Sequence, residues 1–353
     1  PVGDGSTGKI MFRTPLYAIP PTTPAALKQE KLISYKDSIK TLIAGDQYTA
    51  GNLKRSLFGE HYRDTWATPI KVKYLDISAF AGGLTPVKMG GGKQTTSLQL
   101  QGKDGNLYQF RTVEKNPAAL LPEGFLKTFA EDFIQDQISS AHPYGALIVP
   151  GMAKAIGIYH TDPQLVYMPY STVLGPYIQQ VGGKLGIIEA RPDEDLSDFK
   201  SFGNARNAVS TGKMYKEIKK DNDNKVDQEM FLRARLFDIL IGDWDRHEDQ
   251  WRWAEFKNDK GSLYRPIPRD RDQAFTKFDG IIPSLVSEIL PDIQSFKSDI
   301  KSPAELSIAA RNLDRNLLNK LSKDKWEEIA RDIQTKLPDD VIRKSVSKMP
   351  AEV

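Results

Sequence analysis

Two acidic segments on either side of one predicted hairpin constrain this chain more than any other feature of its sequence. The first segment follows an apolar helical run, spans residues 242–250 and reads GDWDRHEDQ. The second spans 267–275 and reads IPRDRDQAF. Burying so many charges in a core would cost too much desolvation free energy. We therefore expect both segments to be loops that carry a function.

The residues between the two acidic segments predict an antiparallel hairpin. Residues 251–256 and 263–267 are rich in strand-forming side chains, and 257–261 contain the Asn, Asp and Gly of a turn. The hairpin should therefore bring the two acidic loops together. Helix, acidic loop, hairpin and acidic loop is an order in which phosphotransferases hold a catalytic base beside a metal ligand.

The composition is that of a globular protein and excludes several kinds of site. With 353 residues, the chain is long enough for one two-lobed domain or two ordinary domains. Its net charge of +3 is too small to indicate a nucleic-acid partner. The chain has no cysteine, which excludes thiol catalysis, disulfides and cysteine zinc sites. No apolar run reaches the roughly 18 residues that a transmembrane helix needs.

The first half of the chain shows the short periodicity of β-strands. Residues 70–74, 97–100 and 108–112 predict strands, and Gly90, Gly91 and Gly92 lie between the first two. Backbone amides in such a glycine run can approach a phosphate closely, although a flexible hairpin is the alternative. Further strands are predicted at 165–168, 177–181 and 185–190, and helices at 123–140, 145–155, 226–241, 303–321 and 323–337.

These elements predict an α+β fold with two lobes. We expect an irregular N-terminal arm (1–45), a β-rich lobe (46–192) and a mostly helical lobe with both acidic loops (193–353). The polar stretch 191–211 is the expected connection between the lobes, and 213–225 an exposed loop or helix end.

Two carboxylates on the predicted helix 123–140 border its apolar face. Asp132 and Asp136 lie one turn apart there. A carboxylate at the margin of a buried face usually has a cationic partner, for which Arg111 and Lys115 on the preceding strand are the candidates. A solvated acid is the alternative for either residue.

Both acidic segments resemble motifs of atypical kinases. The stretch Asp245 to Gln250 resembles the D-R-x-N-x-N catalytic loop of phosphatidylinositol kinases, and 267–275 is similar to the I-P-x-D-x-D-x-x-F segment of spore-coat (CotH) and related secreted kinases. The order of parts from 70 to 275 resembles the protein-kinase-like fold. More loosely, the chain resembles kinase-like regions joined to metallophosphoesterase domains and outer-membrane barrels in bacteria.

The resemblance implies ATP and Mg²⁺ or Mn²⁺ as cofactors, and a role for each matching residue. Asp245 would orient the attacking hydroxyl and accept its proton. Gln250 would stand where these kinases bind the second metal ion through Asn. Asp270, with Asp272 as a close alternative, would bridge the metal to the nucleotide phosphates. Arg111 would hold the α and β phosphates, with Asp136 as its partner from the helix.

Two departures from the kinase pattern leave the function open between an enzyme and a binding module. Gln250 is one methylene longer than Asn, and the planar fork of Arg111 differs from the point charge of Lys; Lys88, Lys93 and Lys115 are alternatives for that role. The leading hypothesis is a kinase that transfers the γ-phosphate of ATP to a hydroxyl of a protein, lipid or sugar. The alternative is a nucleotide-binding pseudokinase or structural module of a larger bacterial envelope protein.

A third hypothesis is phosphoester hydrolysis at a metal site made by the following residues: Asp243, Asp245, His247, Asp270 and Asp272. We rank it last because no H-x-H or H-E-x-x-H spacing accompanies them. Some of these acids should also form salt bridges with Arg246, Arg269 and Arg271. The lack of an initiator Met leads us to expect a piece of a longer polypeptide, and the looser resemblance to bacterial envelope proteins implies an extracytoplasmic location.

Overall fold

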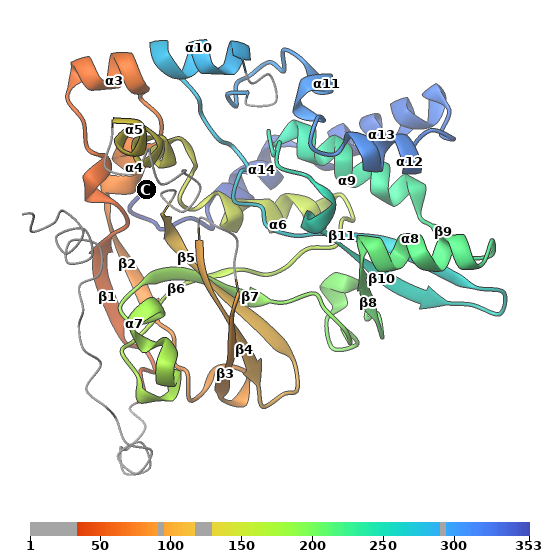
Figure 1. The fold of residues 1–353 in the computed structure, drawn as a ribbon, viewed down its shortest axis with the longest axis horizontal. Coiled ribbons are helices and arrows are strands. Elements are labelled where there is room, and N and C mark those ends of the chain that lie inside the picture. The colour runs from red at the N-terminus through yellow and green to blue at the C-terminus, as the bar shows by residue number, and fades with distance from the viewer. Residues whose placement is uncertain (1–33, 91–94, 117–128, 290–293) are drawn as a thin grey trace, which may run out of the picture.

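The computed structural model describes residues 34–90, 95–116, 129–289 and 294–353. Strands dominate the first part of the chain and helices the second (Figure 1). The predicted α+β class, with a β-rich part followed by a mostly helical part, is therefore confirmed. Gly91, Gly92 and Lys93 lie outside the described residues, as does most of the predicted N-terminal arm.

The first part of the chain forms a seven-stranded sheet in the order β1-β2-β6-β7-β5-β4-β3. Its neighbouring strands are antiparallel except for the parallel pair β2 and β6. The strand bounds are β1 (Ile39–Ile43), β2 (Pro69–Tyr74), β3 (Leu84–Gly90), β4 (Thr95–Gly102), β5 (Leu107–Lys115), β6 (Gln164–Tyr167) and β7 (Leu185–Ala190). The sequence predicted no strand between 74 and 97, but β3 lies there and ends at Gly90.

The second sheet has four strands in the order β8-β10-β11-β9 and contains the predicted hairpin. Its strands are β8 (Ala208–Ser210), β9 (Lys225–Val226), β10 (Trp251–Lys257) and β11 (Ser262–Pro268). β10 and β11 are antiparallel, with Trp251 opposite Pro268 and Lys257 opposite Ser262. The hairpin prediction is confirmed, and its open end faces the acidic loops.

Helices surround both sheets. Their bounds are α3 (Asn52–Phe58), α4 (Arg63–Ala67), α5 (Phe129–Gln137), α6 (Gly145–Ala155), α7 (Ile178–Val181), α8 (Thr211–Lys220), α9 (Gln228–Leu240), α10 (Ile281–Ile289), α11 (Pro303–Leu306), α12 (Arg311–Leu317), α13 (Lys323–Lys336) and α14 (Asp339–Val346). Side-chain caps fix several starts: Ser210 accepts from Lys213 N, and Asp227 from Met230 N. The predicted helix 145–155 has the observed bounds of α6.

Three local predictions are corrected by the structure. Residues 177–181 are helical, not a strand: a 3-10 turn capped by Ser171 leads into α7, whose Val181 packs in the core beside the sheet. Tertiary packing here overrides the β-branched composition. The segment expected to be an irregular arm contains β1, and 213–225 consists largely of α8.

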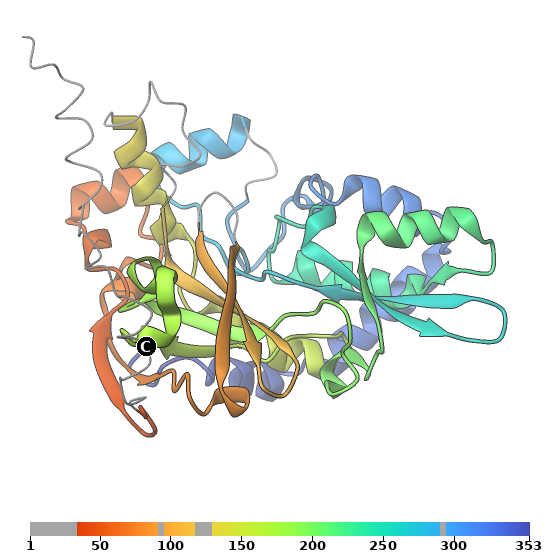
Figure 2. The same cartoon turned by 60° about the horizontal axis from the view of Figure 1, so that its bottom comes forward.

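α6 lies between the two parts of the molecule (Figures 1 and 2). Its Leu147 packs with Ile70 and Val72 of β2, whereas Ile148 and Met152 belong to the large core around α9 and β10. One apolar helix therefore serves two cores, which fixes the first sheet against the helical part.

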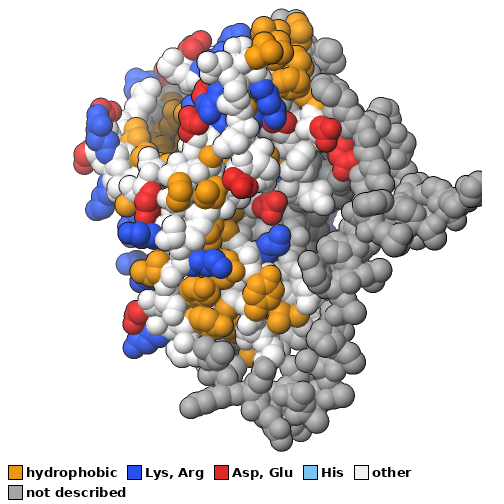
Figure 3. Space-filling model, turned by 90° about the vertical axis from the view of Figure 1, so that its left-hand side faces the viewer, with side chains coloured by type: hydrophobic (Ala, Val, Ile, Leu, Met, Phe, Trp, Pro, Cys, Tyr) orange, Lys and Arg blue, Asp and Glu red, His pale blue; other side chains and the backbone are white. Residues whose placement is uncertain are grey.

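The face that carries β1 has apolar side chains scattered among charged ones (Figure 3). Ile39 and Ile43 of β1 and Leu53 of α3 are exposed. No helix in the described part of the chain is long and apolar enough to cross a membrane.

Candidate functional site

The two acidic loops meet at the open end of the β10–β11 hairpin. The backbone N–H of Arg269 donates to the carbonyl oxygen of Gln250 over 2.9 Å. The buried Arg246 guanidinium joins the same loops, since it donates to Arg269 O (2.7 Å) and Gln250 O (3.2 Å). One buried cation and the strand register thus hold the loops in a fixed relation.

Behind the loops lies a buried network of charges that is structural. Arg271 Nη1 donates to Asp243 Oδ2 over 3.0 Å and also pairs with Asp238 on α9. Arg246 contributes a further cation 3.4 Å from Asp238. Burial raises the pKa of Asp243 to about 6, although both arginines oppose the rise. Asp243 is therefore a partner of the arginines, contrary to the metal-ligand role of the hydrolysis hypothesis.

Asp245 is placed differently, because about a third of its side chain (34%) is exposed. His247 Nε2 lies 3.8 Å from Asp245 Oδ1. Burial raises the pKa of the Asp245 carboxyl, and the nearby negative charges of Asp272 and Asp270 add to the rise, while His247 opposes it. Asp245 is therefore within electrostatic reach of both aspartates of the second loop.

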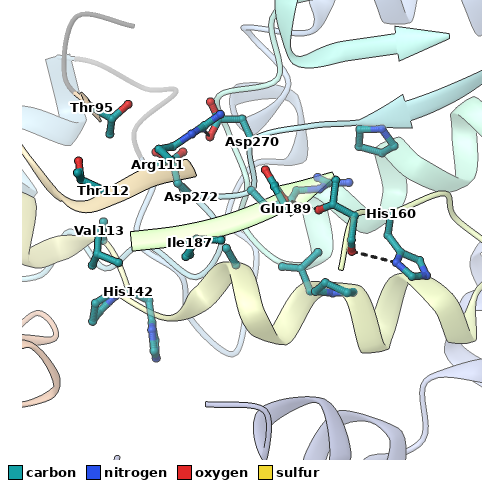
Figure 4. Close-up of a pocket in the computed structure, with 18 of the residues that line it drawn as sticks. Thr95, Arg111, Thr112, Val113, His142, His160, Ile187, Glu189, Asp270 and Asp272 are labelled. Carbon is teal, nitrogen blue, oxygen red and sulfur yellow. Dashed lines mark hydrogen bonds and ion pairs between the residues drawn. The ribbon is translucent and has the colours of Figure 1, made fainter. Parts of the chain in front are cut away.

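Two cations on β5 face that second loop. Arg111 pairs with Asp270 (Figure 4), and Lys115 Nζ lies 2.6 Å from Asp272 Oδ2. The pairing of β5 with β4 is irregular between these two residues, yet both side chains reach the same loop. Burial opposes ionisation of Asp270, but Arg111 and Lys115 lower its pKa below the usual range. The sheet and the hairpin loop therefore meet through two ion pairs.

Glu189 on β7 is a site residue that sequence reasoning missed. Its carboxylate lines the same cleft as Arg111 and accepts a hydrogen bond from Thr161 (Figure 4). Burial raises the pKa of Glu189, although Arg111 and Thr161 oppose the rise. The sequence carried one signal, since a Glu inside the apolar strand run 185–190 is unusual.

The cleft beyond these charges has an apolar wall. Small and branched side chains of the sheet and α6 line it: Val113, Ala146, Val149, Ala153 and Ile187. His142 also lines it, and burial lowers the pKa of this histidine to about 4. The cleft therefore has a charged end at β5 and an apolar wall along α6.

The structure does not bring Asp136 to Arg111. Asp136 accepts from Arg63 Nη2 (2.7 Å) and Nη1 (2.9 Å), and Lys54 Nζ lies 2.7 Å away. Arg63 is fully buried and needs a counter-charge, which this face of α5 supplies. The predicted pairing of Asp136 with Arg111 is therefore wrong, and Asp132 is exposed.

Gln250, Gly90 and Lys88 are not among the residues that line the cleft. Gln250 ends a 3-10 turn (Glu248–Gln250) just before β10, and its carbonyl is the acceptor described above. Gly90 ends β3 opposite Ser97, and Lys88 is exposed on the same strand. Within the described residues, no three His, Asp or Glu side chains lie close enough together to hold a metal ion.

Two solved kinase structures are similar to most of this chain. The Helicobacter pylori proinflammatory kinase CtkA is 13% identical, covering 75% of this chain and 96% of its own, with a TM-score of 0.30. The Rio2 kinase from Chaetomium thermophilum, in an ADP/Mg²⁺-phosphoaspartate complex, is 10% identical over 74% of this chain and 71% of its own, with a TM-score of 0.28. No family model and no curated protein matches the chain. Because both TM-scores are low, the function proposed below rests on contacts within this chain.

Proposed function

We propose that this protein is an atypical kinase, which transfers the γ-phosphate of ATP to a hydroxyl acceptor. One observation supports the proposal: Asp270 and Asp272 pair with Arg111 and Lys115 where the hairpin meets β5, and the charges of both aspartates act on Asp245 in the neighbouring loop. A partly exposed carboxylate beside a second carboxylate pair and two cations is the set of groups that phosphoryl transfer requires.

Asp245 is the proposed base. Its raised pKa makes it a better proton acceptor than an ordinary aspartate, and its partial exposure leaves it accessible to an acceptor hydroxyl. Arg111 and Lys115 would hold the phosphates, and Glu189 would keep the Arg111 guanidinium oriented from the strand beside it. The apolar wall on α6 would receive the base of the nucleotide.

The donor set fits a hard divalent cation. Asp270, Asp272 and Gln250 carry the carboxylate and amide oxygens that such a cation prefers, and burial together with the charges of Asp272 and Asp270 raises the pKa of Asp245. These three residues would hold Mg²⁺ or Mn²⁺, which when bound neutralises charge on the phosphates. Arg111 and Lys115 now neutralise the two aspartates, and they would turn to the phosphates of the nucleotide.

Phosphate transfer from radiolabelled ATP to the protein itself, to casein and to glycerol tests the proposal. We expect Asp245→Asn to lose about 100-fold or more of the activity, since general-base catalysis contributes that much. Asp270→Asn should abolish transfer as well. Glu248→Gln, an exposed substitution in the same loop, is the matched control. Wild-type activity in both aspartate variants would refute the proposal.

A pseudokinase is the second candidate, and the ion pairs of Asp270 and Asp272 favour it. Both proposed metal ligands have cationic partners, and Gln250 and Arg111 depart from the kinase pattern. A nucleotide-binding module would show ATP-dependent stabilisation without transfer. Stabilisation without transfer would therefore support the pseudokinase, and the absence of both would leave only a structural role.

A further inference from the structure

We propose that the groove between β2, α6 and α14 is a docking site for an acidic, amphipathic segment of a protein partner. This groove lies on the side of α6 away from the proposed active site, although His160 and Pro150 line both. The inference does not depend on the proposed kinase activity.

Five lysines form the rim of the groove. Lys71 and Lys73 come from β2, Lys154 from α6, Lys344 from α14 and Lys348 from the turn after α14. All five are exposed, and none pairs with a carboxylate in the part of the chain that the structure describes. Asp162 is the one acid among the described lining residues, and it lies 3.6 Å from His160. Uncompensated positive charge thus surrounds a concave surface.

The floor of the groove is aliphatic. Its lining includes Val72 and Leu165 from the sheet, Leu147 from α6, and Val341 and Met349 from the C-terminal side. Leu165, Val341 and Met349 are only partly buried, so part of this floor is open to contact. A partner that matches both features has carboxylates at its margins and apolar side chains at its centre.

The close contact of α14 with α6 sets the shape of the groove. The two helices lie side by side (Figure 2), and a Cβ at Gly151 would lie only 2.4 Å from Ser345 Oγ. Glycine at this position lets α14 approach closely, which holds Lys344 and Lys348 opposite Lys154. Four of the five rim lysines therefore lie on a strand or a helix, and Lys348 lies in the turn after α14.

Other polyanions match the groove less well. The described lining contains no Arg to grip phosphates bidentately, and no Phe, Tyr or Trp on which nucleic-acid bases would stack. A flat bilayer would touch the lysine rim but not a concave aliphatic floor. The chemistry of the whole groove therefore favours a polypeptide.

Fluorescence anisotropy with labelled synthetic peptides tests the inference on the full chain. The first probe alternates Glu and Leu, and the second replaces each Leu by Ser. We expect the Glu–Leu peptide to bind about tenfold more tightly than the Glu–Ser peptide, because only the former covers the floor. Its affinity should also fall as salt screens the rim.

Charge reversal identifies the binding surface. The triple variant Lys71→Glu, Lys154→Glu and Lys344→Glu should weaken binding of the Glu–Leu peptide about tenfold or more. The control triple on α8, Lys213→Glu, Lys216→Glu and Lys219→Glu, changes the net charge equally and should bind like the wild type. Melting curves verify that both variants fold.

Three results would overturn the inference. If the groove variant keeps wild-type affinity, the peptide binds elsewhere on the protein. If the α8 variant loses as much affinity as the groove variant, binding depends only on the net charge of the protein. Equal binding of the Glu–Ser peptide, or tighter lysine-dependent binding of single-stranded DNA or of phosphatidylglycerol vesicles, would assign the rim to a general polyanion. If the triple variant does not fold, the salt dependence and the two-peptide comparison on the wild type still test whether binding requires both charge and apolar contact.

Discussion

At the scale of single residues, the environment of each carboxylate sets its role. Asp243 and Asp245 are two positions apart, yet Asp243 is buried among arginines and Asp245 is partly exposed beside His247. Asp136 is nearly buried and bound to Arg63, so it stabilises the fold. The acidic residues of this chain thus divide into structural partners of arginine and a smaller set that faces the cleft.

The pH dependence of transfer should reveal the environment of Asp245. A general base must be ionised to accept a proton. Burial together with Asp272 and Asp270 raises the pKa of Asp245. As the pH is lowered, activity should therefore begin to fall at a higher pH than it would with an ordinary aspartate as the base. A protonated His247 opposes that rise. The variant His247→Gln should therefore move the acid limb of kcat/KM to higher pH, whereas Glu248→Gln should leave it in place. If the acid limb of kcat/KM does not move in His247→Gln, the charge of His247 does not influence the pKa of the base.

Asp136 should contribute to stability in a pH-dependent way. Burial alone would raise its pKa, but Arg63 and Lys54 lower it, so its contribution is complete above the unfolded pKa of about 3.9 and is lost as pH falls through the folded pKa. Near neutral pH, Asp136→Asn leaves Arg63 buried without its counter-charge and should cost about 3 kcal/mol of unfolding free energy. Urea unfolding measures this loss.

The control for Asp136 is Asp64→Asn, which breaks a pair between Arg55 and an exposed aspartate (78%). This loss should be below about 1 kcal/mol because solvent screens the pair. Equal losses in the two variants would contradict the assignment of Asp136 as the buried counter-charge.

At the scale of elements, sequence patterns predicted what depends on local order. The bounds of α6, the β10–β11 hairpin and the strand 185–190 follow from periodicity and turn residues. The strand predicted at 177–181 was wrong because packing beside the sheet decides that segment. The same limit explains the error at Asp136, since Arg63 approaches it from an element far away in sequence, and no periodicity encodes such a contact.

The packing of α14 on α6 gives a prediction for glycine. Gly151→Ala would place a Cβ against Ser345, so α14 must shift, and we expect a loss of about 1–3 kcal/mol in unfolding free energy. Gly212→Ala in α8 meets no atom within 4 Å and should stabilise by up to about 1 kcal/mol. Thermal and urea unfolding of both variants measure this difference, and a neutral Gly151→Ala would contradict the close contact.

At the scale of the whole molecule, the cleft lies where two differently built parts meet. The seven-stranded sheet supplies Arg111 and Lys115, and the hairpin of the second sheet supplies the loop with Asp270 and Asp272. Two ion pairs and the shared helix α6 connect these parts. A ligand in the cleft therefore contacts both parts at once and should stabilise them together.

Nucleotide binding should raise the melting temperature through contacts from both parts. ATP with Mg²⁺ at about 100 times its dissociation constant stabilises the native state by about 2.7 kcal/mol, provided that it binds only that state. Arg111→Met removes a proposed phosphate contact and frees Asp270, so the shift should shrink, whereas Lys103→Met in the exposed turn between β4 and β5 should keep it. Because Arg111→Met also breaks an ion pair, the quantity compared is the shift that nucleotide produces in each variant, not the absolute melting temperature. An equal nucleotide-induced shift in Arg111→Met and in the wild type would contradict the proposed contact between the nucleotide phosphates and Arg111 on β5.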